Sequence, residues 1–130
     1  MYPLKRNRRL RTTAALRELV SESTLSISDL LAPLFLIEGS NIKESVDSMP
    51  GVYRYTINRL SQIVDRALKQ KIPMIALFPK THNSHKDELG TESLNEKNLV
   101  CRAIKEIKKR YKNQIGIMCD VALDLSLIHI

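Results

Sequence analysis

Three short apolar runs, separated by longer amphipathic stretches, limit what this chain can fold into. The runs lie within the segments APLFLIEG, IPMIALFP and QIGIMCDVALD, at about residues 33–37, 72–79 and 115–123. They do not alternate between apolar and polar residues, which is typical of strands that are covered on both faces. Such strands usually form a parallel sheet with helices packed against it.

The stretches between the runs predict amphipathic helices at residues 57–70 and 95–111. In the first, Leu60, Val64 and Ala67 recur at helical spacing, and Thr56 is the expected N-cap. Residues 40–56 are expected to form a loop. The order strand, helix, strand, helix, strand fits either a doubly wound sheet or part of a (β/α) barrel. The four glycines include no G-x-G-x-x-G spacing, which disfavours a nucleotide-binding sheet.

The positive charge of the chain is concentrated in its first residues. Five of the 21 basic residues lie within residues 1–11 without an acid, so the other 119 residues carry 16 basic and 14 acidic side chains, a net charge of +2. Residues 1–27 are predicted to be a basic arm and a short helix, capped by Thr12 or Thr13. The arm suits nucleic-acid phosphates and an acidic neighbouring subunit equally well, so a small basic nucleic-acid-binding protein is the alternative function.

Length, hydropathy and cysteine content limit the number of domains, the association with membranes and the cellular compartment. A chain of 130 residues holds one modest domain, expected at residues 28–124. No apolar run approaches the roughly 18 residues of a membrane span, so no membrane partner is expected. Two cysteines, Cys101 and Cys119, make no disulfide framework, which favours the cytoplasm.

Asp120 is the candidate catalytic residue, because it stands near the carboxyl end of the third predicted strand, where parallel α/β folds gather their chemistry. An aspartate that caps a loop is an equally good interpretation of that position. A second candidate is the loop with His82 and His85, followed by two acids, whose H-x-x-H spacing is able to bind a metal. It lacks the thiolates or helical register of a strong metal motif, so a solvated loop is favoured.

Several motifs, in order, resemble the porphobilinogen synthase (delta-aminolevulinic acid dehydratase) family. They are RRLRTTAALRELVSEST, LLAPLFLIEG, SMPGVYRYTINRL, IPMIALFP and IMCDVALD, from about residue 6 to residue 124. The resemblance implies the N-terminal part, about three strands, of a (β/α)8 TIM barrel preceded by an extended basic arm. It also implies the condensation of two 5-aminolevulinate molecules to porphobilinogen, with Asp120 as the active-site aspartate. The arm is then expected to hold other subunits of a homo-oligomer, an octamer, which makes nucleic acid the weaker partner.

The same resemblance gives an expectation for metals. Zinc-dependent members carry cysteines at the positions of Ala122 and Asp124. A carboxylate in place of a thiolate favours Mg²⁺, with Asp124 as a ligand, and no cysteine-rich zinc site is expected. The family binds substrate as Schiff bases on two lysines of late strands, and Lys71, Lys80 and Lys97 do not match them. The fragment alone is therefore expected to be inactive.

The last six residues, LSLIHI, depart from the family pattern after DVALD. The codons CTG-TCT-CTT-ATA-CAC-ATC encode these six residues, and that DNA string is the transposon-end adapter used in preparing sequencing libraries. The hypothesis is that residues 125–130 are non-native read-through into adapter, and a divergent natural tail is the alternative.

Overall fold

The computed structural model describes residue 4 and residues 7–120, and it is built around one five-stranded sheet. The strands are β1 (Leu31–Leu36), β2 (Lys43–Ser45), β3 (Tyr53–Tyr55), β4 (Met74–Pro79) and β5 (Gly116–Cys119). The helices are α1 (Ala14–Leu19), α2 (Leu60–Lys69) and α3 (Leu99–Tyr111). Short 3₁₀ turns lie at Arg9–Arg11, Ile27–Asp29, Ile57–Arg59, Asn83–His85 and Thr91–Leu94.

The strand order is β2-β3-β1-β4-β5. β1 pairs in parallel with β4 over its whole length, from Leu31 beside Met74 to Leu36 beside Pro79, and β4 pairs in parallel with β5. β3 runs parallel to β1 over two residues, and β2 closes the edge antiparallel to β3. The predicted parallel sheet is confirmed for the three apolar runs.

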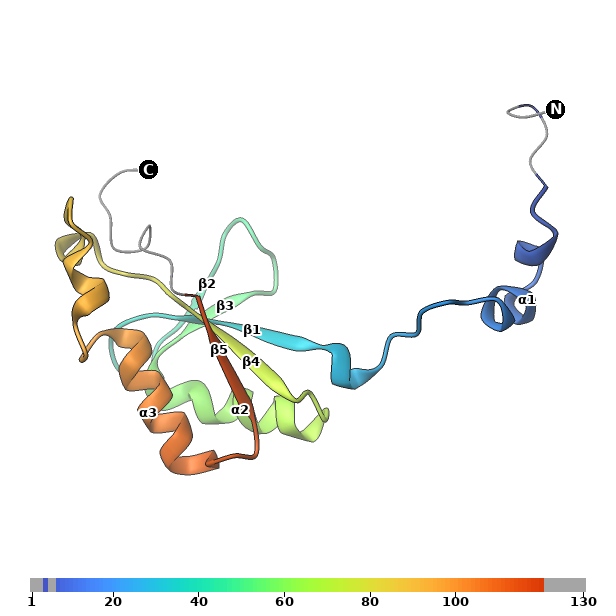
Figure 1. The fold of residues 1–130 in the computed structure, drawn as a ribbon. Helices are drawn as coiled ribbons and strands as arrows, with labels where there is room; N and C mark the ends of the chain where they lie inside the picture. The colour runs from blue at the N-terminus through green and yellow to red at the C-terminus, as the bar shows by residue number, and fades with distance from the viewer. Residues whose placement is uncertain (1–3, 5–6, 121–130) are drawn as a thin grey trace.

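Both long helices lie on one side of the sheet (Figure 1). The core is the apolar layer between them and the sheet, where β1, β4, α2 and α3 contribute Leu34, Leu36, Ile75, Leu77, Leu60, Val64, Ala67, Leu99, Ala103 and Ile107. A doubly wound sheet would carry helices on both faces, so the one-sided cover favours the barrel.

The segment before the sheet stands apart from it. α1 begins after Thr13, whose hydroxyl accepts a hydrogen bond from the backbone N–H of Leu16 at 3.2 Å, so the predicted cap is confirmed. No residue of α1 is buried, and an extended stretch separates the helix from β1 (Figure 1). The predicted domain limits at residues 27 and 124 remain predictions.

Residues 40–56 differ from the prediction of a plain loop, because β2 and β3 form there. Thr56 is the N-cap residue of the 3₁₀ turn Ile57–Arg59 that leads into α2, as predicted, but its side chain makes no cap hydrogen bond. The fully buried Thr56 hydroxyl instead accepts from the N–H of Ile42 at 3.0 Å and donates to Oδ1 of Asn58 at 2.7 Å. The Thr56 hydroxyl thus links the residue just before β2 to the 3₁₀ turn that leads into α2.

Among the described residues, no helix combines the length and apolar character that crossing a membrane requires.

Candidate functional site

The chain leaves β1, β4 and β5 at the same edge of the sheet, because the three strands are parallel. Glu38 follows β1, Lys80 follows β4 and Asp120 follows β5 directly. Asp120 is exposed there. Its position is therefore where the sequence predicted it, at the carboxyl edge where loops of such folds converge. Its catalytic role stays a prediction.

The side of the sheet that faces away from α2 and α3 is here called the helix-free face. Leu34, Leu36 and Leu77 point into the core, so the residues between them alternate to the helix-free face. The rings of Phe35 and Phe78 meet on that face, with 5.7 Å between their centroids. Met118 lies opposite Ala76 on the same face and is 50% exposed. If the alternation of β5 continues one residue beyond its end at Cys119, Asp120 lies on this face too, two residues after Met118.

A group of charges lies at the same edge and is here called the Glu44 cluster: Glu44, Arg54 and Lys80. Oε1 of Glu44 accepts a hydrogen bond from Nη1 of Arg54 and another from Nζ of Lys80, each at 2.8 Å. The bond from Lys80, together with that from Arg54, lowers the pKa of Glu44, because both cations favour the carboxylate. Sequence reasoning missed this cluster, because no local pattern signals contacts over 10 and 36 positions.

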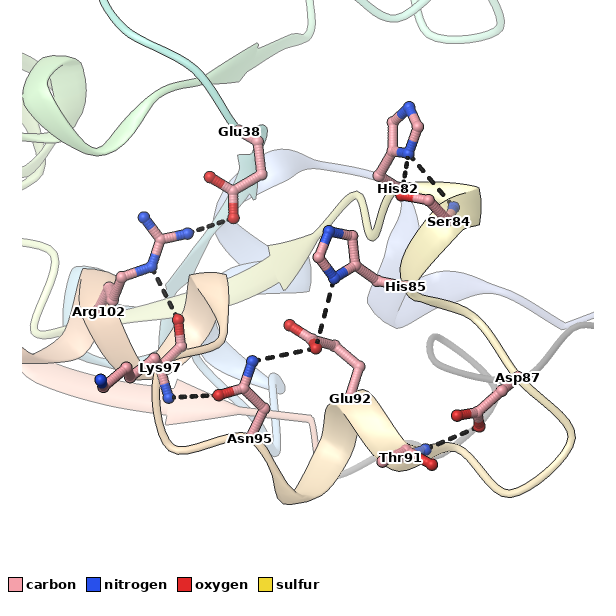
Figure 2. A network of polar contacts seen from close by, with 10 residues as sticks. All are labelled: Glu38, His82, Ser84, His85, Asp87, Thr91, Glu92, Asn95, Lys97 and Arg102. Carbon is pink, nitrogen blue, oxygen red and sulfur yellow. Dashed lines mark hydrogen bonds and ion pairs between the residues drawn. The ribbon is translucent and has the colours of Figure 1, made fainter.

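The loop between β4 and α3 carries the two histidines of the alternative metal motif (Figure 2). Nδ1 of His82 contacts the hydroxyl of Ser84 at 2.8 Å, and Nδ1 of His85 lies 3.6 Å from a carboxylate oxygen of Glu92. Asp87 accepts from the backbone N–H of Thr91 at 2.9 Å, and hydrogen bonds from Thr91 lower its pKa. These separate pairings fit the favoured interpretation of a solvated loop. Within the described part of the chain, no three His, Cys, Asp or Glu side chains gather as a metal site.

The start of α3 is fixed to the end of β1 by Arg102. Its Nη2 donates to Oε1 of Glu38, and its Nε donates to the carbonyl of Lys97 at 2.9 Å (Figure 2). Asn98 caps the helix by accepting from the N–H of Cys101 at 2.8 Å. The loop that precedes α3 is therefore held against the edge of the sheet that carries Asp120.

A hollow of about 370 Å³ lies between α2 and α3 and is lined by Ile37, Ser61, Arg102 and Tyr111 among others. It opens on the helical side of the sheet. The hollow is thus separate from the helix-free face, and the reaction expected at Asp120 does not involve it.

Cys119 packs toward the helices against the core, as alternation along the strand predicts. Burial, reinforced by the neighbouring Cys101, raises the pKa of the Cys119 thiol. The residue is thus a packed thiol rather than a reactive one.

Parallel strands β1, β4 and β5 with helices on one side and a carboxylate at their carboxyl edge are typical of the (β/α)-barrel enzymes. The family model for delta-aminolevulinic acid dehydratase matches residues 4–129, and the chain belongs to that family. The family and the partial-barrel fold expected from the sequence are both confirmed.

The relatives carry the same family name. A delta-aminolevulinic acid dehydratase of Bradyrhizobium diazoefficiens is 48% identical over 119 residues, 92% of this chain and 33% of the relative. One from Chlamydia pneumoniae is 39% identical over 96% of this chain and 37% of the relative. The crystal structure of the Toxoplasma gondii ME49 enzyme, in complex with its reaction product porphobilinogen, superposes with a TM-score of 0.82 at 33% identity, over 95% of this chain and 35% of that one. The chain thus spans about a third of the length of these relatives.

The comparisons bear on two further predictions. The named relatives are enzymes, so the nucleic-acid-binding alternative gains no support from them. Asp124, the predicted metal ligand, and the hexapeptide at residues 125–130 both lie outside the described residues, and their assignments remain predictions.

Proposed function

We propose that this chain supplies the first strands and the active-site aspartate of an enzyme that condenses two 5-aminolevulinate molecules to porphobilinogen, with loss of two waters. The observation that carries the proposal is the position of Asp120, a carboxylate at the carboxyl edge of parallel strands in a member of this family. The product named with the Toxoplasma structure supports the choice of reaction.

Asp120 has the chemistry that such a condensation requires. Each lost water needs protons to be moved, and a carboxylate at the substrate acts as a general base or holds an amino group in place. The two lysines that form Schiff bases in the family have no counterpart at Lys71, Lys80 or Lys97. We therefore expect the 130-residue chain to bind or position substrate without turning it over.

The test uses a hybrid enzyme, in which residues 7–124 replace the matching segment of the Bradyrhizobium relative. Colorimetric detection of porphobilinogen is expected to show product from the hybrid and none from the 130-residue chain alone. Asp120→Asn keeps the size of the side chain and is expected to lower kcat of the hybrid by at least about a hundredfold, the usual contribution of acid–base catalysis. A hybrid with Asp120→Asn that keeps full kcat would contradict the role of Asp120.

Magnesium at Asp124 is a further part of the proposal. The described residues alone do not fit a metal site, since no three ligand-type side chains gather among them. The support is the sequence itself, which has Asp124 where zinc-dependent members have a thiolate. Mass spectrometry of the metals bound to the hybrid is expected to find no zinc, and Asp124→Ala is expected to weaken the response of the hybrid to Mg²⁺.

The arm is proposed to bind another subunit of a homo-oligomer in the cytoplasm. Arg8, Arg9 and Arg11 are exposed, and the adjoining helix α1 contributes nothing to the core. Deletion of the N-terminal arm of the hybrid, up to and including residue 11, is expected to lower the mass of the hybrid assembly in analytical ultracentrifugation. An octamer that survives this deletion would contradict the assembly role.

A further inference from the structure

The positive charge beyond the basic arm is concentrated in the two long helices and the residues next to them. Of the 16 basic and 14 acidic side chains after residue 11, the segments 59–71 and 99–112 hold ten and two. Those two segments therefore carry a net charge of +8, and the other residues after residue 11 carry a net charge of −6. Because α2 and α3 lie on one side of the sheet, the positive charge gathers on the helical side of the molecule (Figure 1).

Four lysines of α3 and its C-cap form a group that is here called the lysine stripe: Lys105, Lys108, Lys109 and Lys112. All four residues are exposed. Successive residues of an α-helix are turned by about 100°, so the three lysines within α3 share an arc of about 100°. The buried positions Ala103 and Ile107 lie on the opposite side of the helix. The stripe therefore faces away from the core.

No carboxylate pairs with the lysine stripe in the part of the chain that the structure describes, because the ion pairs found there involve none of its lysines. The acid within the same stretch of α3 is Glu106, which lines the hollow between α2 and α3 together with Arg102 and Arg110. The stripe thus presents four positive charges to solvent.

The stability of α3 does not account for the lysine stripe. Cations in the last turn of a helix interact favourably with its negative end, which explains Lys108 and Lys109. Lys105 lies before that turn. The pairs Lys105 with Lys109 and Lys108 with Lys112 place like charges four positions apart, which destabilises a helix. The arrangement therefore indicates a surface that binds an anion.

The composition of the lysine stripe favours a nucleic acid over other anionic partners. A helix that lies on a membrane inserts its apolar face, but the apolar face of α3 is buried in the core. Protein–protein interfaces are poor in lysine and rich in aromatic residues, and the stripe has the opposite composition. Interfaces with nucleic acids are strongly positive, and lysines that neutralise phosphates supply much of their affinity.

We propose that the lysine stripe binds the phosphate backbone of a nucleic acid without reading its sequence. From Lys105 to Lys112 the helix axis advances by about 10 Å, the axial length of about three nucleotides at about 3.4 Å each. Tyr111, the aromatic residue beside the stripe, is buried and its hydroxyl is bonded to Asp65, so its ring does not stack on a base. The inference goes beyond the proposed function, and the stripe shares no residue with the basic arm or with Asp120.

The experiment measures the binding of a fluorescein-labelled 20-nucleotide single-stranded RNA to the hybrid enzyme by fluorescence anisotropy. The test variant combines Lys105→Gln with Lys109→Gln, because glutamine and lysine have similar helix propensities. At 150 mM KCl the test variant is expected to raise the Kd by about tenfold. The slope of log Kd against log salt is expected to fall by about 1.4, since each lost phosphate contact removes about 0.7. RNAs of different base composition are expected to bind alike.

The matched control combines Lys43→Gln with Lys97→Gln, two exposed lysines outside α3, and has the same net charge as the test variant. Equal losses of affinity in the two variants, or RNA binding that neither variant changes, overturn the inference. Urea unfolding of the test variant is expected to show no loss of stability, because a like-charge pair has been removed. Lower stability with unchanged RNA affinity would show that the lysines support the fold, and would also overturn the inference.

Two further probes separate the nucleic acid from other anions, and activity separates the inference from the proposed function. Binding of phosphatidylglycerol vesicles or of poly-glutamate, without binding of RNA, would assign the stripe to a membrane or to an acidic protein and overturn the inference. The test variant is expected to keep the kcat and KM of the hybrid. An active hybrid that binds no RNA contradicts this inference alone, whereas an inactive hybrid that binds RNA through the stripe contradicts the proposed function alone.

Discussion

The phenol of Tyr111 donates a 2.6 Å hydrogen bond to Oδ1 of Asp65 and thereby joins the last turn of α3 to α2. Burial, and then the hydrogen bond to Asp65, raise the pKa of Tyr111 to about 12, because both disfavour the phenolate. The phenol therefore stays protonated, and the bond stays in place, well beyond neutral pH.

Removal of this hydroxyl is expected to destabilise the packing of α3 on α2. Tyr111→Phe leaves the ring in place and is expected to lower the free energy of unfolding by about 1 kcal/mol, the net contribution of one hydrogen bond. Urea unfolding followed by circular dichroism measures the change. Tyr53→Phe, on the half-buried β3, is the control. Equal losses in the two variants would show that the bond to Asp65 contributes nothing specific.

Two glycines with positive φ allow a matched test of the turns around β2 and β3. Gly39 has φ +116°, and an added Cβ would lie 2.6 Å from Cδ1 of Ile42. Gly51 has φ +83° and open space around it. Gly39→Ala is expected to cost about 1–3 kcal/mol of stability through backbone strain, since the end of the Ile42 side chain is able to move aside. Gly51→Ala is expected to cost less in the same denaturant titration, and the reverse order would contradict the placement of the Gly39 turn.

The Glu44 cluster predicts a loss of stability in acid. The pKa of Glu44 is lowered from 4.5, chiefly by the hydrogen bond from Lys80, so the folded protein binds this proton less tightly than the unfolded chain. Its contribution to stability is complete above pH 4.5 and is lost as the pH falls through the lowered pKa. Thermal unfolding between pH 7 and pH 3 is expected to show a smaller decrease in Tm for Glu44→Gln than for the parent chain. Equal decreases in Tm for the two proteins would mean that the ion pairs of Glu44 do not stabilise the fold.

The thiol of Cys119 is expected to react slowly in the folded protein. Its pKa is raised from 9.0 by burial, so little thiolate is present near neutral pH. In a Cys101→Ser variant Cys119 is the remaining cysteine, and alkylation by iodoacetamide at pH 8 is followed by mass spectrometry. The rate is expected to be several times lower than in the urea-unfolded variant, and similar rates would mean that the thiol is open to solvent.

The parts of the fold that follow from burial could be predicted from the sequence. The apolar run that became β4 and the stripe of Leu60, Val64 and Ala67 on α2 both follow from periodicity, because each buries a face against the same core. β2 could not be predicted, because Lys43, Glu44 and Ser45 form no apolar pattern. The strand is held instead by its pairing with β3.

The residues of the candidate site also differ in whether the sequence alone could predict their contacts. Asp120 could be placed at the sheet edge because it directly follows an apolar strand. Lys80 also follows a strand, but its contact with Glu44 depends on the tertiary placement of β2, which no local rule gives. A residue that acts at the end of its own strand is thus visible in the sequence, whereas a cluster assembled across strands is not.

The spatial sequence β1, β4, β5 repeats the temporal sequence in which a ribosome produces these strands. Each strand–helix unit emerges next to a neighbour that has already been synthesised, so pairing can advance in step with translation. No later segment has to intervene between two earlier strands of this trio. The architecture thus suits folding that begins during translation, with each new strand of this trio added at the edge of the sheet already formed.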